Sequence, residues 1–400
     1  MKTNQWFDNA PDRRGSGSYK WDSAEDGQVI PLWVADMDFR TAPIVVEALK
    51  RRVEHGIFGY TLVEEDYYQA LQNWFSSRHG YTIRRENVIY TSGVVPAISA
   101  IIKALAKPGD GVIVQTPVYN CFFSSIRNNG CRIEEAPLKR VDGAPGLFTY
   151  EMDFELLEEK ASLPDVKLML LCNPHNPAGR AWSREELNRV AEICRRHNVT
   201  VVSDEIHCEL TMPGYEYTPY GTIDNNAIVC LSPSKAFNTA GLQIANIVSP
   251  NLKIRQLVDK AININEVCDV NPFGPIALKA SYSKEGEEWL DALRHYLEEN
   301  YLLLLNIFQE TLPECEVTKL EATYLPWIDV RKLNLNSTVI EERMMEEAKV
   351  WVNSGDMYGK DGYIRINIAC PRKRLAEGLK RVADWLRAEF DKQSDPSGVV

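Results

Sequence analysis

The chain has 400 residues, of which 44% are hydrophobic and 25% charged, a composition typical of globular proteins and a length that suits two domains. A net charge of −11 without a basic run disfavours nucleic acid as a partner, and no apolar run has signal-peptide or membrane-spanning character. The nine cysteines form no C-x-x-C pair and the six histidines no H-E-x-x-H, so we expect a reducing, cytoplasmic setting and no metal site.

The first 30 residues are polar and are predicted to form an arm. The segment P-L-W-V-A-D-M-D-F follows at 31–39, and helical periodicity predicts a helix over 44–55. The next loop, 56–61, contains two glycines, Gly56 and Gly59, which let the backbone approach closely and the Tyr60 side chain project. A half-buried tyrosine is the simpler interpretation from these residues alone.

Short apolar runs alternate with helical patterns through the middle of the chain. Strands are predicted over 87–91, 111–115, 166–172, 199–203 and 227–231, and helices over 97–106 and 184–197. Ser183 and Glu186 have the spacing of a capping box for the second of these helices. Such alternation predicts a largely parallel sheet with helices on both faces.

Three successive strands end in polar side chains. Asn173 and Asn176 follow the first strand, Asp204 the second, and S-P-S-K, ending in Lys235, the third. Ligands bind at the carboxyl ends of parallel strands. Pyridoxal 5′-phosphate needs a lysine to carry it as an imine, a carboxylate for its ring nitrogen and an amide for its ring oxygen. S-P-S-K alone indicates no more than a surface turn, but the three strand ends together predict a site for this cofactor.

Two further turns allow two interpretations each. Ser92-Gly93-Val94-Val95 joins a strand to a helix, where free backbone N–H groups bind phosphate, although a plain β–α turn has the same pattern. Tyr119 lies just past another strand end, where it stacks on a planar ring or packs under a loop.

The last part of the chain is predicted to be a smaller domain. A long helix over 284–311 is placed to link it to the rest, and strands follow at 323–330 and 363–369. Arg365 lies between isoleucines in the second strand, so its guanidinium needs either a substrate carboxylate or a structural salt bridge. We predict an arm that joins the small domain (1–45), a large cofactor-binding domain (46–283) and the small domain (284–400).

Taken together, these segments resemble the fold-type I pyridoxal-phosphate enzymes of the aspartate aminotransferase superfamily, and among them the MalY/PatB-like cystathionine β-lyase (C–S lyase) branch. The resemblance covers nearly the whole chain. Its markers are P-L-W-V-A-D-M-D-F, F-G-Y-T, S-G-V-V-P-A, T-P-V-Y, N-P-H-N-P-A-G, S-D-E-I-H, S-P-S-K-A-F-N-T-A-G-L and Y-I-R-I-N. It implies an α/β fold, with a mostly parallel seven-stranded type of sheet between helices in the large domain and an α+β small domain.

The resemblance also implies catalytic roles. Lys235 would hold the cofactor and act as acid and base, Asp204 would pair with the pyridine nitrogen, and Tyr119 would stack on the ring. Arg365 would clamp the substrate carboxylate, together with the backbone near Ala35.

Other residues would hold the remaining parts of the cofactor. The ring-oxygen side would be served by Asn176, Asn173 and His207, the last in place of a tyrosine, and the phosphate by the amides of Val94 and Val95 with Ser232 and Ser234. Tyr60 would reach the phosphate and substrate of a neighbouring subunit, which implies a homodimer with shared active sites. Gln243 stands where many aminotransferases have a phosphate-binding arginine.

The implied activity is α,β-elimination from a small sulfur-containing amino acid, with release of thiol, pyruvate and ammonia. Lys235 would remove the Cα proton. An aminotransferase would use the same residues, so it is the alternative. A third hypothesis is a regulatory protein that uses the fold as a binding surface. The sequence does not choose the preferred sulfur amino acid.

Overall fold

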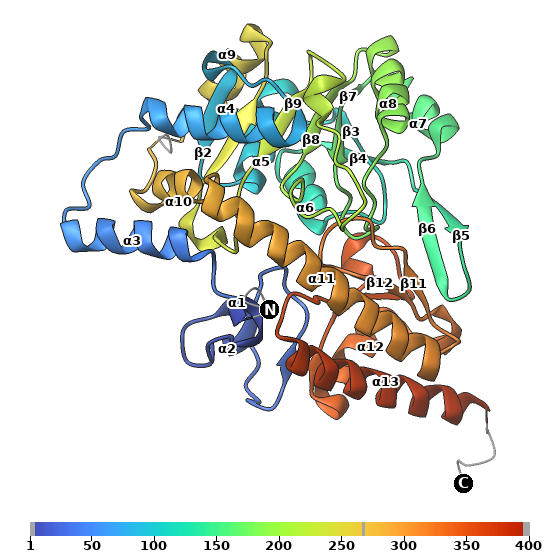
Figure 1. Ribbon diagram of the computed structural model, residues 1–400. Coiled ribbons are helices and arrows are strands. Elements are labelled where there is room, and N and C mark those ends of the chain that lie inside the picture. Colours follow the sequence, from blue (N-terminus) through green and yellow to red (C-terminus); the bar gives the residue numbers. More distant parts are fainter. Residues whose placement is uncertain (1–4, 266–268, 395–400) are drawn as a thin grey trace.

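The structure, a computed structural model, describes residues 5–265 and 269–394 and has a seven-stranded sheet at the centre of its larger part (Figure 1). In spatial order the strands are β2 (Val88–Thr91), β10 (Ala245–Val248), β9 (Ile228–Leu231), β8 (Thr200–Asp204), β7 (Val166–Cys172), β3 (Gly111–Val114) and β4 (Arg132–Glu135). Only β10 runs antiparallel to its neighbours. The predicted mostly parallel, seven-stranded sheet is therefore confirmed.

Both faces of this sheet are buried, which explains the continuous apolar runs of its central strands. Leu168 and Leu170 of β7 pack on the side of α5 (Val94–Leu105), α6 (Asn120–Asn128) and α9 (Leu252–Asn263). Met169 and Leu171 pack on the opposite side, against α7 (Phe154–Ala161) and α8 (Arg184–Arg196). The predicted capping box is present at the start of α8: Ser183 accepts from the Glu186 amide, and the Glu186 side chain accepts from the Ser183 amide.

The smaller part is built on a second, six-stranded sheet. Its order is β14 (Asn353–Ser354), β15 (Tyr363–Arg365), β12 (Trp327–Asp329), β11 (Glu316–Thr318), β6 (Leu147–Glu151) and β5 (Lys139–Asp142). The β5–β6 hairpin thus extends from the middle of the chain into the sheet of the later strands (Figure 1). Helices α12 (Ser337–Arg343) and α13 (Arg372–Ser394) belong to this part.

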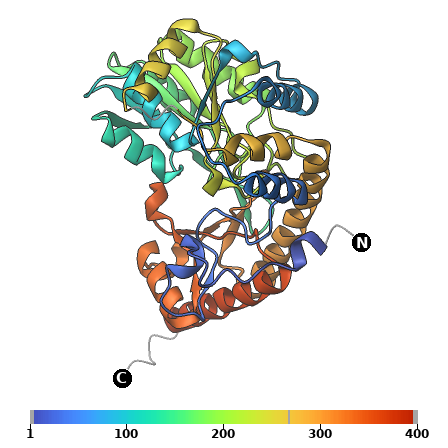
Figure 2. The same cartoon turned by 90° about the vertical axis from the view of Figure 1, so that its left-hand side faces the viewer.

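Helix α11 (Lys284–Thr311) runs between the two parts, as its predicted span implied (Figures 1 and 2). Helix α10 (Phe273–Ser281) packs against α3 (Pro43–His55) and α4 (Glu65–His79). No helix within the described ranges is both long and apolar enough to cross a membrane.

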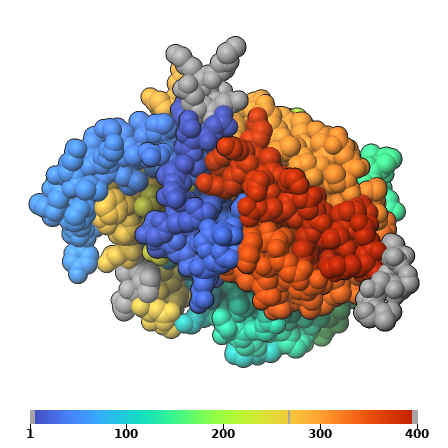
Figure 3. Space-filling view, turned by 90° about the horizontal axis from the view of Figure 1, so that it is seen from below, coloured from blue at the N-terminus to red at the C-terminus, as the bar shows by residue number. Residues whose placement is uncertain are grey.

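The N-terminal arm packs on the small domain. It contains α1 (Gln5–Asp8), α2 (Tyr19–Asp22) and β1 (Ile30–Pro31), and β1 pairs in parallel with β13 (Val350–Trp351). The view from below shows this arm lying against the C-terminal helix α13 (Figure 3).

Two predicted strands are shorter than expected. The 323–330 run forms only β12, and the 363–369 run only β15. Beyond β15 the regular ladder ends, although Ile366 still donates to the Pro326 carbonyl, because Pro326 has no N–H to donate in return and Asn367 donates to the Leu32 carbonyl of the arm. The apolar pattern predicted burial correctly, but it could not distinguish sheet pairing from these irregular contacts.

Candidate active site

A cavity of about 200 Å³ lies at the carboxyl ends of β7, β8 and β9, where the sequence predicted a site. Both parts of the molecule contribute to it, because the arm residue Ala35 lines it together with large-domain residues. Ten of the predicted residues share this lining: Ala35, Val94, Val95, Tyr119, Asn176, Asp204, His207, Ser232, Ser234 and Lys235.

Lys235 follows β9 on a short turn, and its Nζ donates to the Ala35 carbonyl at 2.6 Å. Burial, followed by the nearby positive charge of Arg365, lowers the pKa of this ammonium group to about 8. A substantial fraction of the amine is therefore neutral near physiological pH, the state in which a lysine is a nucleophile and a base.

Asp204 is the last residue of β8 and is almost completely buried. Its Oδ1 accepts one hydrogen bond, from the Ile206 amide at 3.1 Å. Burial raises the pKa of this carboxyl to about 6, against the opposing effects of that amide and of Lys235. A buried carboxylate with so few hydrogen bonds is stabilised by a cationic partner such as a protonated ring nitrogen.

An anion-binding cradle lies at the start of α5. The N-cap residue Gly93 has no capping side chain, so the helix begins with backbone amides that face the cavity end. Ser232 donates to the Ile244 carbonyl at 2.7 Å and accepts from the Ser234 amide at 3.2 Å. Ser232 thus holds the turn, and the Ser234 hydroxyl lines the cavity.

Arg365, on β15, is only 3% exposed. Its Nη1 donates to Asn176 Oδ1 at 3.1 Å and its Nη2 to the Trp33 carbonyl at 3.0 Å, while the guanidinium carbon lies 4.7 Å from the Tyr358 ring centre. Its Nε has no hydrogen-bond partner. None of these partners is a carboxylate, so within the described part of the chain the salt-bridge alternative has no support. A buried guanidinium in this state favours an anionic ligand.

Two aromatic side chains complete the walls. Burial, then Lys235 and Arg365, lower the pKa of His207 well below its ordinary value, so a neutral imidazole lines the cavity, and its Nδ1 has no partner. Burial and the adjacent Cys121 thiol raise the pKa of Tyr119 well above its ordinary value. Tyr119 therefore stays a neutral phenol.

Three predicted residues, Arg365, Asn173 and Tyr60, are not among those that line this cavity. The side-chain amide of Asn173 donates to Glu205 at 3.1 Å and to the Thr218 carbonyl at 3.0 Å. These bonds direct the Asn173 side chain toward the buried Glu205 instead of the cavity. Tyr60 is 99% exposed and does not line the cavity of its own chain.

The sequence reasoning did not assign several residues that the fold brings here. Gln243, with a left-handed backbone (φ 51°), lines the cavity. Tyr324 donates to the Ala35 carbonyl at 3.0 Å, and the Trp33 carbonyl accepts from Arg365. The resemblance marked the position of Gln243 after Lys235 without giving this residue a role, and a sequence pattern gives no signal for backbone carbonyls.

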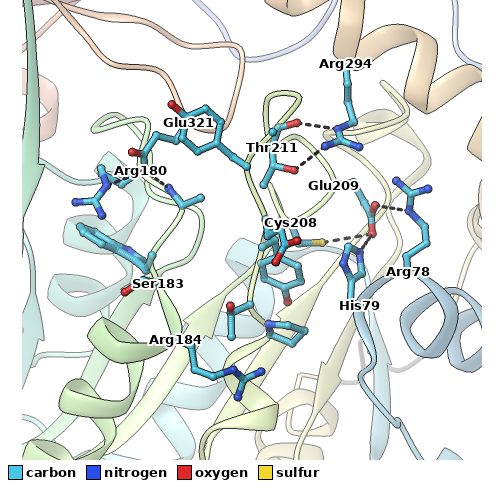
Figure 4. A pocket seen from close by; sticks show the side chains of 18 residues that line it. Arg78, His79, Arg180, Ser183, Arg184, Cys208, Glu209, Thr211, Arg294 and Glu321 are labelled. Carbon is cyan, nitrogen blue, oxygen red and sulfur yellow. Dashed lines mark hydrogen bonds and ion pairs between the residues drawn. The ribbon is translucent and has the colours of Figure 1, made fainter. Parts of the chain in front are cut away.

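A larger polar pocket, of about 780 Å³, is lined by residues that follow His207 in the chain, among them Cys208, Glu209 and Thr211 (Figure 4). Several of its charged side chains already have partners: Arg78 and His79 bind Glu209, and Arg294 binds Thr211. The smaller cavity contains a lysine of lowered pKa, and its wall residue Asn176 accepts from Arg365, a buried guanidinium without a carboxylate partner. The smaller cavity is therefore the better candidate for catalysis.

A lysine, a buried carboxylate and an anion cradle at the ends of parallel strands define a pyridoxal-phosphate enzyme of fold type I. Comparisons with known proteins agree. The family model of aminotransferase class I and II matches residues 27–382, so the chain belongs to that family. It is 40% identical to cystathionine β-lyase PatB of Bacillus subtilis, over 94% of this chain and 98% of the relative.

Two other relatives point to the same branch. Protein MalY of Escherichia coli is 32% identical, over 96% of this chain and 99% of MalY. The crystal structure of cystalysin from Treponema denticola, which contains pyridoxal 5′-phosphate, superposes with a TM-score of 0.91 at 35% identity, over 96% of this chain and 98% of cystalysin. The predicted resemblance is confirmed, and pyridoxal 5′-phosphate is the cofactor.

The residues present fit this cofactor. Lys235 would hold it, Asp204 would face the ring nitrogen, and the α5 amides with Ser234 would bind its phosphate. The buried Nδ1 atom of His207 has no hydrogen-bond partner, so it is free to form a hydrogen bond with a bound cofactor. These individual roles stay predictions.

Cofactor loading is predicted to depend on the titration of Lys235. Because the neutral amine attacks the cofactor aldehyde, the loading rate of cofactor-free protein should rise with pH and level off above about pH 8. Stopped-flow absorbance measures this rate, with Nα-acetyl-lysine amide as the control amine. A protein rate that climbs through pH 10 in parallel with the control would contradict the lowered pKa.

Asp204→Asn is predicted to stabilise the cofactor-free protein. The folded-state pKa of about 6 exceeds the ordinary 3.8, so ionisation of Asp204 costs stability as pH rises through this window, and the full cost applies at neutral pH. Removing it should raise the free energy of unfolding by up to about 3 kcal/mol at pH 7.5, with a smaller gain at pH 5. Denaturant titration at both pH values is the measurement, and equal or lower stability at pH 7.5 would contradict it.

Proposed function

We propose that this protein is a pyridoxal-phosphate-dependent C–S β-lyase that releases thiol, pyruvate and ammonia from a small sulfur-containing amino acid. The relatives named as cystathionine β-lyase and the C–S lyase structure of Staphylococcus hominis (32% identity, TM-score 0.87) support this reaction type. The buried Arg365 without a carboxylate partner is the observation that carries the substrate class, because an amino acid supplies the missing anion.

The bound cofactor supplies an electron sink for charge that develops at the substrate Cα. Arg365 would hold the α-carboxylate through its paired Nη atoms, with Asn176 and the Trp33 carbonyl fixing the plane of the guanidinium. This orientation places the Cα proton toward the face from which Lys235 acts.

Lys235 would remove that proton, since its lowered pKa keeps part of the amine neutral in a site from which bulk water is largely excluded. Asp204 would keep the ring nitrogen protonated, because its charge is otherwise poorly compensated in its buried position. A thiolate at Cβ would then leave. An aminotransferase would instead return the proton to the cofactor, and the same three residues would serve it.

Assembly as a homodimer with shared sites is part of the proposal. The loop after α3 exposes large apolar side chains: Ile57 is 66% exposed, Phe58 54%, Tyr60 99% and Leu62 83%. Such a patch is typical of a protein interface. We place Tyr60 in the cavity of the partner subunit, where it would complete the phosphate and substrate site.

A cytoplasmic location is the final part of the proposal. Eight cysteines of the described residues are free thiols, and the ninth, Cys268, lies outside them. Free, mostly buried thiols are typical of a reducing compartment.

Elimination from L-cystathionine is the direct test of the activity. Cofactor-loaded protein should release pyruvate and thiol in equal amounts without any keto acid, and Lys235→Ala should lower the rate by about 10³-fold or more. Lys253→Ala, an exposed lysine of α9, is the control and should keep the full rate. Transfer of amino groups to an added keto acid, without pyruvate release, would establish the aminotransferase instead.

Subunit mixing tests the shared site. Tyr60→Ala and Lys235→Ala proteins should each have low activity. Refolding them together should restore about a quarter of the wild-type sites, because half of the dimers are mixed and each mixed dimer has one intact site. No recovery, despite mixed dimers seen by native mass spectrometry, would place Tyr60 outside the partner's site.

A further inference from the structure

Residues 33–38, here called the bridging segment, supply main-chain contacts to the two basic groups of the active site. The Trp33 carbonyl accepts from Arg365 Nη2 at 3.0 Å, and the Ala35 carbonyl accepts from Lys235 Nζ at 2.6 Å. The segment has no regular secondary structure, so other contacts must fix where these two oxygens lie.

One set of contacts comes from two asparagines, one just beyond β15 and one on the turn after β9. Asn367, just beyond β15, donates to the Val34 and Asp36 carbonyls at 2.6 and 2.7 Å. Asn238, on the turn of Lys235, accepts from the Met37 amide at 3.0 Å and donates to the Met37 carbonyl at 2.9 Å. These contacts hold the segment from the side of the cavity.

The other set comes from the N-terminal arm and consists of charged side chains around the buried Lys20 and Asp38. The Lys20 side chain is 0% exposed, and its Nζ donates to the Asp36 carbonyl at 3.1 Å and lies 3.3 Å from Asp38 Oδ1. Arg13 donates to Asp36 at 2.6 Å and to Asp38 at 3.1 Å. On the far side, Arg374 of α13 donates to Asp38 at 3.0 Å.

This cluster is costly to bury, because ions lose hydration that apolar side chains would not require. Burial alone would raise the pKa of Asp38, yet Lys20, the Trp21 indole and the two arginines hold it below its ordinary value, so Asp38 stays an anion. The benefit of such a cluster over an apolar one is geometric: charged donors define one position for the segment.

We propose that Lys20 and Arg13 are positioning residues for catalysis, which act through the bridging segment on Arg365 and Lys235. Lys20 contributes most directly, because it donates to the carbonyl of Asp36, next to Ala35. The arm is therefore part of the catalytic apparatus, although neither side chain lines the cavity. The inference rests on the proposed function for its link to the reaction.

Lys20→Met is the first test variant, because the methionine fills a similar volume and Asp38 keeps Arg13, Arg374 and Trp21 as partners. Arg13→Gln is the second, at a side chain that is 21% exposed and so tolerates change more readily. Lys349→Met is the matched control: it removes an exposed ion pair between the same arm (Asp26) and the small domain, away from the bridging segment.

The readout is the binding of L-alanine, which has the α-amino and α-carboxylate groups but no leaving group, to cofactor-loaded protein by visible absorbance. Both test variants should weaken binding by about 10-fold, as expected for one weakened hydrogen bond to a charged group. Hydrogen exchange by mass spectrometry should accelerate in the peptide covering 33–38 and stay unchanged elsewhere, and Lys349→Met should match wild type in both measurements.

Wild-type alanine affinity in both test variants would overturn the inference. So would faster exchange throughout the chain with a matching loss of melting temperature, which would show a general structural role. Neither readout requires carbon–sulfur cleavage. If wild-type protein binds alanine without eliminating thiol from cystathionine, the proposed activity fails while the positioning role is still tested.

Discussion

The structure depends on holding an amine, a carboxyl group and a guanidinium together in a place that water hardly reaches. Burial acts on the first two in opposite directions: it lowers the pKa of Lys235 to about 8 and raises that of Asp204 to about 6. Both shifts disfavour charge, and both make the groups more reactive toward a cofactor that supplies the missing partner charges. Burying these groups costs stability, and the apolar layers on both faces of the sheet offset that cost.

The site joins the two parts of the molecule through hydrogen bonds rather than through a large apolar interface at the cavity itself. Asn176 of the large domain accepts from Arg365 of the small domain, and Lys235 reaches the arm at Ala35. The arm is in turn anchored by Lys20, Arg13 and Arg374. Substrate binding and proton transfer therefore depend on one connected set of contacts that extends far from the reacting atoms.

The sequence predicted this site well where chemistry lies in side chains at strand ends. Lys235 and Asn176 follow β9 and β7, and Asp204 ends β8, as expected, since parallel strands bring their carboxyl ends together. It failed where contacts are made by the backbone. No pattern distinguished Asn173, which turns to the buried Glu205, from Asn176, and nothing predicted that the Trp33 carbonyl would bind Arg365. The antiparallel direction of β10 also has no signature in a strand of four residues.

The central claim is that Lys235 carries the cofactor in the cavity described. Borohydride reduction of the cofactor-loaded protein, followed by digestion and mass spectrometry, tests it most directly, because reduction makes the lysine–cofactor bond permanent. The account predicts one pyridoxyl group per chain, attached to Lys235. The Lys235→Ala variant, which keeps Asp204, should carry none. Labelling of another lysine, or no labelling despite full loading, would contradict it.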